Sequence, residues 1–108
     1  MNWNVLNSED QLDAIAQLSF TKPVVIFKHS TRCSISTMAK ARLERSIQPE
    51  TVDFYYLDLL NYRAISNKVA ELFSVPHESP QVLLIKNAEC VYEETHNGID
   101  MNEILGQL

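Results

Sequence analysis

Cys33 is the residue of this sequence best placed to do chemistry. It follows a polar turn, which itself follows the apolar, β-branched run 24–27, and a helical pattern begins just after it. Binding sites in open α/β sheets form beyond the carboxyl ends of the strands. A helix N-terminus there offers unpaired N–H groups and a positive partial charge. Lys28, His29 and Arg32 are expected to add positive charge, so the pattern predicts a reactive thiolate, the nucleophile of thiol–disulfide exchange.

The residue three positions after Cys33 indicates which kind of exchange is possible. In a dithiol oxidoreductase this position holds a second cysteine, which resolves the mixed disulfide. Here the segment reads Cys33-Ser34-Ile35-Ser36, and a serine cannot resolve a disulfide. The sequence therefore predicts a monothiol mechanism, in which an external thiol releases the small thiol that Cys33 has accepted. A buried structural cysteine is the alternative, but it fits a polar turn poorly.

The elements that must position Cys33 can be traced from hydrophobic periodicity and turn residues. Helices are predicted over about 9–19, from Cys33 towards Pro49, after Asn61, and after Asp100. The helix after Cys33 is expected to turn five apolar residues inward: Ile35, Met38, Ala39, Leu43 and Ile47. Strands are predicted at 24–27, 52–60, 81–86 and 90–95, with a short one possible near 4–6. The last two long strands must form an antiparallel hairpin, because their connection is too short for a crossover.

This order of elements predicts an α/β fold of the thioredoxin-like type. It would have a central mixed sheet, with parallel strands and a C-terminal antiparallel hairpin, flanked by four helices. In such folds a cis-proline that faces the reactive cysteine begins a strand, so Ser79-Pro80 is expected to be cis and to bind substrate; Pro76 is the rival position. Gly98 and Asp100 open the last helix. Asp100 could accept a bond from a substrate amine, although capping alone explains it equally well.

Length, charge and cysteine count bound the remaining possibilities. The 108 residues suit one domain spanning 1–108, and the net charge of −5 disfavours nucleic-acid binding. The start of the chain shows no signal peptide and no run is long enough to span a membrane, so a cytoplasmic protein is expected. Basic residues gather in 22–45 around Cys33, whereas acidic residues dominate 71–103 around Cys90. Cys90 is expected to be structural, because it begins the second hairpin strand, far from Cys33.

The segment from Phe27 to Ser36 resembles the monothiol bacilliredoxin family, also called YtxJ-like proteins. Its lysine-histidine-serine run and the Ile35-Ser36 pair after the cysteine are shared with that family, as are Trp3, Ser79-Pro80-Gln81 and Asn97-Gly98. Thr31 lies in the same segment and is expected to support the active site. Ser34 stands where the family usually has proline, and Arg32 where threonine is common. The resemblance implies a thioredoxin fold and the removal of bacillithiol from S-thiolated client proteins through Cys33. Bacillithiol carries a malate with two carboxylates and a glucosamine amine, which the basic segment would suit.

Two other functions remain open from the sequence. One is a redox-inactive thioredoxin-fold module that binds a partner protein. The other is a monothiol glutaredoxin-like protein, although Ser34-Ile35 does not match the Gly-Phe of the cluster-bridging glutaredoxins. A metal site made by His29, Cys33 and His77 would lack a fourth ligand, so no metal is expected. The expected partners are S-thiolated client proteins and a small thiol that acts as co-substrate, with no resident cofactor, nucleic acid or membrane.

Overall fold

A central sheet with helices on both faces forms the frame of the computed structural model, which describes residues 1–108. The strands are β1 (Trp3–Val5), β2 (Val24–His29), β3 (Asp53–Asp58), β4 (Gln81–Lys86) and β5 (Glu89–Thr95). The helices are α1 (Asp10–Leu18), α2 (Ser34–Glu44), α3 (Arg63–Phe73) and α4 (Met101–Leu105), with a 3₁₀ turn, η1 (His96–Gly98), before the last. These elements confirm the predicted mixed α/β fold, including the short first strand.

The sheet has the order β1-β3-β2-β4-β5. Strands β1, β3 and β2 are parallel, while β4 runs antiparallel to both β2 and β5. The predicted hairpin is therefore present, and β2 lies at the centre with every residue buried. A strand enclosed on both faces needs apolar side chains in both directions, which explains the continuous run of Val24-Val25-Ile26-Phe27.

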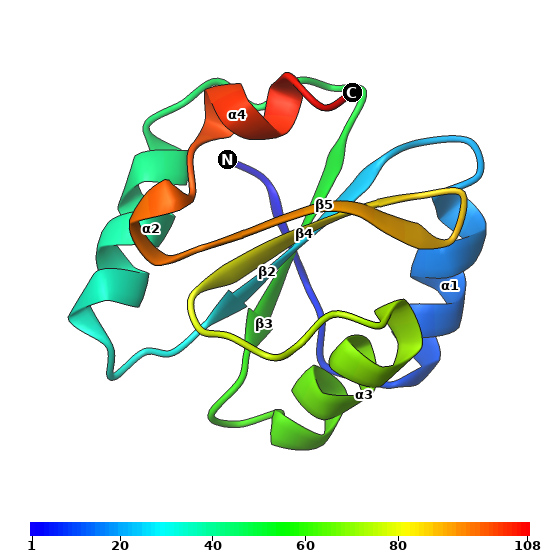
Figure 1. Ribbon diagram of the computed structural model, residues 1–108, viewed down its shortest axis with the longest axis horizontal. Coiled ribbons are helices and arrows are strands. Elements are labelled where there is room, and N and C mark those ends of the chain that lie inside the picture. The colour runs from blue at the N-terminus through cyan, green and yellow to red at the C-terminus, as the bar shows by residue number, and fades with distance from the viewer.

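Two separate hydrophobic cores lie on the two faces of the sheet. Helices α1 and α3 cover one core and α2 and α4 cover the other, as Figure 1 shows. Side chains alternate along β2, so Val24 and Ile26 enter the α1/α3 core, while Val25 and Phe27 enter the α2/α4 core. The same alternation must send the last two residues of β2 to opposite faces.

Helix α2 presents a different face to the core from the one predicted. Ala39 and Leu43 are buried as expected, but Ile35 is 41% exposed and Met38 is 61% exposed. Ile47 is 90% exposed, because the helix ends at Glu44 and leaves this residue outside it. The third buried position of the helix is Ser36, a polar residue that the apolar pattern did not include.

The start of α3 also differs from prediction. Tyr62, and not Asn61, occupies the N-cap position, and no side chain caps this helix. The amide of Asn61 instead donates to the Asp58 carboxylate at 2.7 Å, which fixes the turn after β3.

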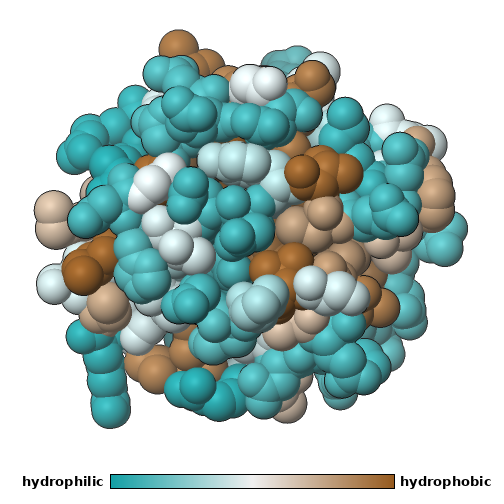
Figure 2. Space-filling model, viewed as in Figure 1, coloured by the Kyte–Doolittle hydropathy of each residue, from teal (hydrophilic) through white to brown (hydrophobic).

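On the face drawn in Figure 2, a group of hydrophobic residues lies right of the centre, within an otherwise predominantly hydrophilic surface. No helix in the chain has the length and hydrophobicity that crossing a membrane requires.

Leu43 and Ile47, the last two apolar residues of the pattern predicted for α2, give a test of this packing. We expect Leu43→Ala to lower the free energy of unfolding by about 2–5 kcal/mol, because it opens a cavity in the α2/α4 core. Ile47→Ala, the matched control, should change it by less than about 0.5 kcal/mol. Urea denaturation followed by circular dichroism measures both, and equal losses would contradict the position of α2.

Candidate active site

Cys33 lies at the carboxyl end of β2 and forms the N-cap of α2. Its N–H donates to Ser30 O at 3.1 Å, and its carbonyl accepts the Thr37 N–H at 3.0 Å. No side chain caps the helix at this end, so the N–H groups of the first turn, beginning with the exposed Ser34, remain free for an anion. The partly exposed Cys33 side chain therefore stands beside the positive end of the helix dipole and its free N–H groups.

Ser36 faces the protein interior. Its Oγ lies 2.7 Å from His29 Nδ1 and accepts the Ser30 N–H at 3.1 Å. The side chain at this position thus ties the loop before Cys33 to the end of β2. The residue that would be a resolving cysteine in a dithiol enzyme is here an anchor for the cysteine loop.

His29 does not supply the positive charge that the sequence suggested. Its ring is almost fully buried and packs against Phe27 and Tyr56, with ring centroids 5.7 and 5.4 Å away. Burial, reinforced by the positive charge of Lys40, lowers the pKa of His29 below its ordinary value. A neutral imidazole can accept a hydrogen bond from the Ser36 hydroxyl at pH 7. His29 therefore acts as a hydrogen-bond partner and not as a cation.

Lys28 points away from His29, into the α1/α3 face of the sheet. It is fully buried, and burial lowers its pKa from 10.5 to about 8. Its ammonium donates to Ser66 O of α3 at 3.1 Å and lies 3.1 Å from His77 Nδ1. The residue expected to assist Cys33 by charge is thus engaged with α3 and with the loop before β4.

Three loops meet at this end of the sheet. The Ser79–Pro80 peptide bond is cis, as predicted, and the following Gln81 pairs with Lys28 across the β2–β4 ladder. The N–H of His96 donates to Pro80 O at 3.1 Å, which joins η1 to the proline loop. The cysteine loop, the loop before β4 and η1 therefore border one site.

Ser79 has an unused hydrogen-bonding group at this site. Its Oγ is inaccessible to solvent and has no hydrogen-bond partner within the chain. Buried hydroxyls are rarely left without a partner. The chain therefore leaves one hydrogen-bonding group next to Pro80 unused.

Arg42 holds η1 against α2, a role that the sequence did not reveal. Its guanidinium donates to Ile99 O at 3.2 Å and to His96 O at 3.0 Å. Helical spacing places Arg42 within α2, and it gives no sign that a loop 54 residues away contacts this residue. This contact fixes the loop that contains Gly98.

Gly98 and Asp100 hold the positions expected from the sequence. A Cβ on Gly98 would lie 2.5 Å from Glu94 Cδ, so the absence of a side chain lets Glu94 pack under η1. Asp100 Oδ2 accepts the Glu103 N–H at 3.3 Å, which confirms the predicted cap of α4. Its side chain remains exposed and can still meet a ligand.

Arg32 is the free cation beside Cys33. It is exposed, forms no ion pair, and lines a hollow of about 260 Å³ with Thr31, Leu60 and Asn61. The hollow lies between the cysteine loop and the turn after β3. The Arg32 guanidinium at the edge of this hollow can bind a carboxylate.

The largest hollow and the second cysteine lie away from this site. Cys90 pairs with Ile85, which pairs with Val24 at the start of β2, about 16 Å from His29 by strand rise. Its thiol donates to Tyr92 O at 3.3 Å, and burial raises its pKa.

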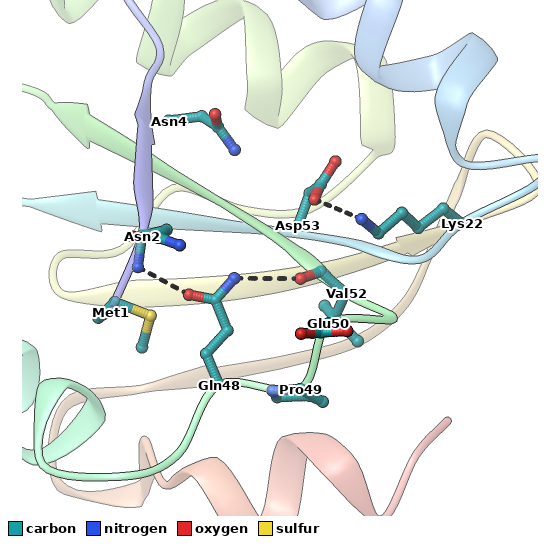
Figure 3. Close-up of a pocket in the computed structure, with 9 residues that line it drawn as sticks. All are labelled: Met1, Asn2, Asn4, Lys22, Gln48, Pro49, Glu50, Val52 and Asp53. Atoms are coloured by element: carbon teal, nitrogen blue, oxygen red, sulfur yellow. Dashed lines mark hydrogen bonds and ion pairs between the residues drawn. The ribbon is translucent and has the colours of Figure 1, made fainter.

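The largest hollow, about 510 Å³, also lies at the amino ends of β2 and β3. Figure 3 shows that several of its polar groups already pair with one another: Lys22 with Asp53 at 2.8 Å, and Gln48 with Asn2 and Val52. Neither this hollow nor Cys90 can take part in chemistry at Cys33. The chain also contains no cluster of three metal-ligating side chains.

A cysteine at a helix N-terminus after the central strand, and a cis-proline just before the antiparallel strand beside it, define a thioredoxin-fold protein. Solved structures agree. A protein described as a candidate oxidoreductase with a thioredoxin fold is 30% identical, with a TM-score of 0.83 over 95% of this chain and 90% of its own. Thioredoxins of Malassezia sympodialis and Trypanosoma brucei brucei share the fold at 22% and 14% identity, with TM-scores of 0.75 and 0.78. They are matched over 97% and 98% of this chain, and over 86% and 87% of their own.

The family can be stated more closely. The model of the monothiol bacilliredoxin BrxC family matches residues 4–104, so the chain belongs to that family. Together with the oxidoreductase neighbour, this membership identifies the chain as a thiol oxidoreductase.

The buried ammonium of Lys28 should give a measurable pH signature. The folded chain releases this proton near pH 8 and the unfolded chain only near 10.5, so between these values the unfolded chain binds more protons. The free energy of unfolding of the wild type, relative to Lys28→Met, should therefore rise by roughly 3 kcal/mol over this range. Urea denaturation at several pH values measures the difference, and parallel curves for the two proteins would contradict it.

Proposed function

We propose that this protein removes a low-molecular-weight thiol from protein mixed disulfides in the cytoplasm by a monothiol mechanism at Cys33. By family resemblance the small thiol is bacillithiol. The partners are then S-thiolated client proteins and the small thiol itself, which acts as a co-substrate. The reaction needs no metal and no resident cofactor.

The observation that carries this proposal is the isolation of Cys33. It is the sole thiol at the carboxyl end of β2, since Cys90 lies at the opposite end of the sheet. The position that could hold a resolving thiol carries the Ser36 hydroxyl, which is turned inward to His29. An intramolecular disulfide is therefore excluded, and only an external thiol can complete a cycle.

The chemistry follows as two exchanges. The Cys33 thiolate attacks the small-thiol sulfur of the mixed disulfide; that S–S bond breaks, the client leaves as a thiolate, and a Cys33–small thiol disulfide forms. A second small-thiol molecule, as thiolate, then attacks this disulfide. Cys33 leaves as a thiolate, and the two small thiols depart as their symmetrical disulfide. Each step forms one S–S bond and breaks one, so no further oxidant or reductant is needed.

The side chains around Cys33 supply groups of the kind that bacillithiol would need. The Arg32 guanidinium can pair with a malate carboxylate. On the other side of the cysteine loop, the exposed Asp100 can meet the glucosamine amine while it still caps α4. The buried Ser79 Oγ, which lacks a partner, can form a hydrogen bond with substrate beside Pro80.

The exposed apolar residues of α2 offer a surface for the client protein. Ile35 and Met38 lie two and five residues after Cys33 and are 41% and 61% exposed. Apolar groups that stand free beside a reactive residue are suited to protein contact. They would cover the client backbone near its modified cysteine.

The decisive experiment incubates the reduced protein with a client that carries bacillithiol on one cysteine. We expect mass spectrometry to find one bacillithiol on Cys33 and a free thiol on the client. Added bacillithiol should then return Cys33 to the reduced form. Cys90→Ser should behave as the wild type does, whereas Cys33→Ser should leave the client modified.

Two results would overturn the proposal. One is a chain of unchanged mass, with Cys33 reduced at the start, which would favour a redox-inactive binding module. The other is removal of the thiol from the client by Cys33→Ser. A client that carries glutathione in place of bacillithiol tests the thiol: we expect slower transfer, and equal rates would remove bacillithiol as the preferred substrate.

A further inference from the structure

Lys28 is a buried cation without a carboxylate partner. It is fully buried and takes part in neither ion pair of the chain. An unpaired buried charge is costly, and an apolar side chain would fill the same space without that cost. Any role that requires a lysine at this position must therefore lie in the two hydrogen bonds of its ammonium, to Ser66 O and to His77 Nδ1.

The contact with His77 fixes the state of that histidine. An ammonium group can only donate, so Nδ1 must carry a lone pair for the 3.1 Å contact to form. Ser66 Oγ lies 3.1 Å from the same nitrogen. The imidazole is thus neutral, with its proton on Nε2. A second proton, on Nδ1, would place two positive donors against each other.

His77 lies within the loop that leads to the proposed substrate-binding residues. It is two residues before Ser79 and three before Pro80. The other side-chain anchor of this loop is Gln81, which reaches Pro76 O at 3.1 Å and Glu78 N at 3.4 Å. Lys28 thus links the end of β2, just before the cysteine loop, to the middle of the loop before β4.

We propose that Lys28 and His77 are a positioning pair, which holds the Ser79–Pro80 segment in place for the reaction of Cys33 with a protein mixed disulfide and releases it when His77 is protonated. This inference rests on the proposed function. It assigns to both residues a role in orienting the client, with no contact to the reacting sulfur atoms.

The charges around His77 decide where on the pH scale release occurs. His77 is an exposed residue, but partial desolvation of its ring, followed by the positive charges of Lys28 on β2 and Arg63 on α3, lowers the pKa of His77, whereas Glu78 in the loop opposes them. The net shift is downward, so the contact is intact at neutral pH and is lost only at an acidic pH below the ordinary pKa of histidine.

The first test compares two reactions of the same cysteine across pH 5–8. Transfer from a bacillithiolated client needs the loop, whereas alkylation by iodoacetamide needs the thiolate alone. The ratio of the two rates cancels the ionisation of Cys33. For the wild type we expect this ratio to fall about five-fold or more towards pH 5.

Three variants isolate the contact. His77→Asn keeps an acceptor for Lys28 but cannot titrate, so its rate ratio should stay within about two-fold over the range. Lys28→Met should give a low ratio at every pH. His96→Asn, which removes a histidine from the neighbouring η1, should retain the wild-type pH dependence. A His77→Asn profile that matches the wild-type profile would overturn the proposal, even if Lys28→Met fails to fold.

A second readout does not depend on thiol transfer. Amide hydrogen exchange of residues 77–79, corrected for intrinsic rates, should accelerate towards pH 5 in the wild type and stay level in His77→Asn. If Cys33 accepts no thiol while this exchange pattern is found, the proposed function fails and the loop contact stands. Exchange that is equally protected at both pH values in both proteins would overturn the positioning pair.

Discussion

The site depends on the way β2 ends. Every residue of this strand is buried, yet its last two residues are Lys28 and His29, whose side chains point to opposite faces. Neither can reach bulk water, so each must find its hydrogen-bonding partners inside the protein. Those partners belong to the segments that carry the site: Ser36 on one face, His77 on the other.

The same principle fixes all three loops around Cys33. The cysteine loop is held by Ser36, the loop before β4 by Lys28, and η1 by the guanidinium of Arg42. Each anchor is a polar side chain of β2 or α2 that bonds to a loop. Ser36 and Lys28 are themselves buried and have few alternative partners, so they restrict their loops most firmly, whereas Arg42 is only half-buried.

The sequence predicted the frame well, because the frame rests on local patterns. The apolar run at Val24, the short turn before Cys90 and the capping arrangement at Asp100 each report on a few neighbouring residues. The strand order, the hairpin and the last helix follow from them. The chemical role of Cys33 was also accessible, since it depends on a strand end, a helix start and the serine at position 36.

The contacts that build the site could not be predicted in the same way. Spacing assigned Ile35 and Met38 to the core, but the orientation of α2 is set by Ser36, whose buried hydrogen bonds turn those residues outward. Arg42 and His77 bind groups 54 and 49 residues away along the chain. A single sequence carries no local sign of such long-range pairs. It also gave no sign that His29 is buried, and burial makes this histidine neutral where a positive charge was expected.

The basic segment around Cys33 shows what this difference means for substrate recognition. In the sequence this segment carries six positively charged side chains. Four of them bind other groups of the protein: Lys22 binds Asp53, Lys28 binds Ser66 O on α3, Lys40 binds Glu44, and Arg42 binds backbone carbonyls. Arg45 lies at the far end of α2, which leaves Arg32 as the one free cation beside the thiol. Selection of an anionic thiol must then come from short-range pairing at a defined position. Short-range pairing of this kind favours a thiol whose carboxylate can reach Arg32 while its sulfur reaches Cys33, over one that is merely negative.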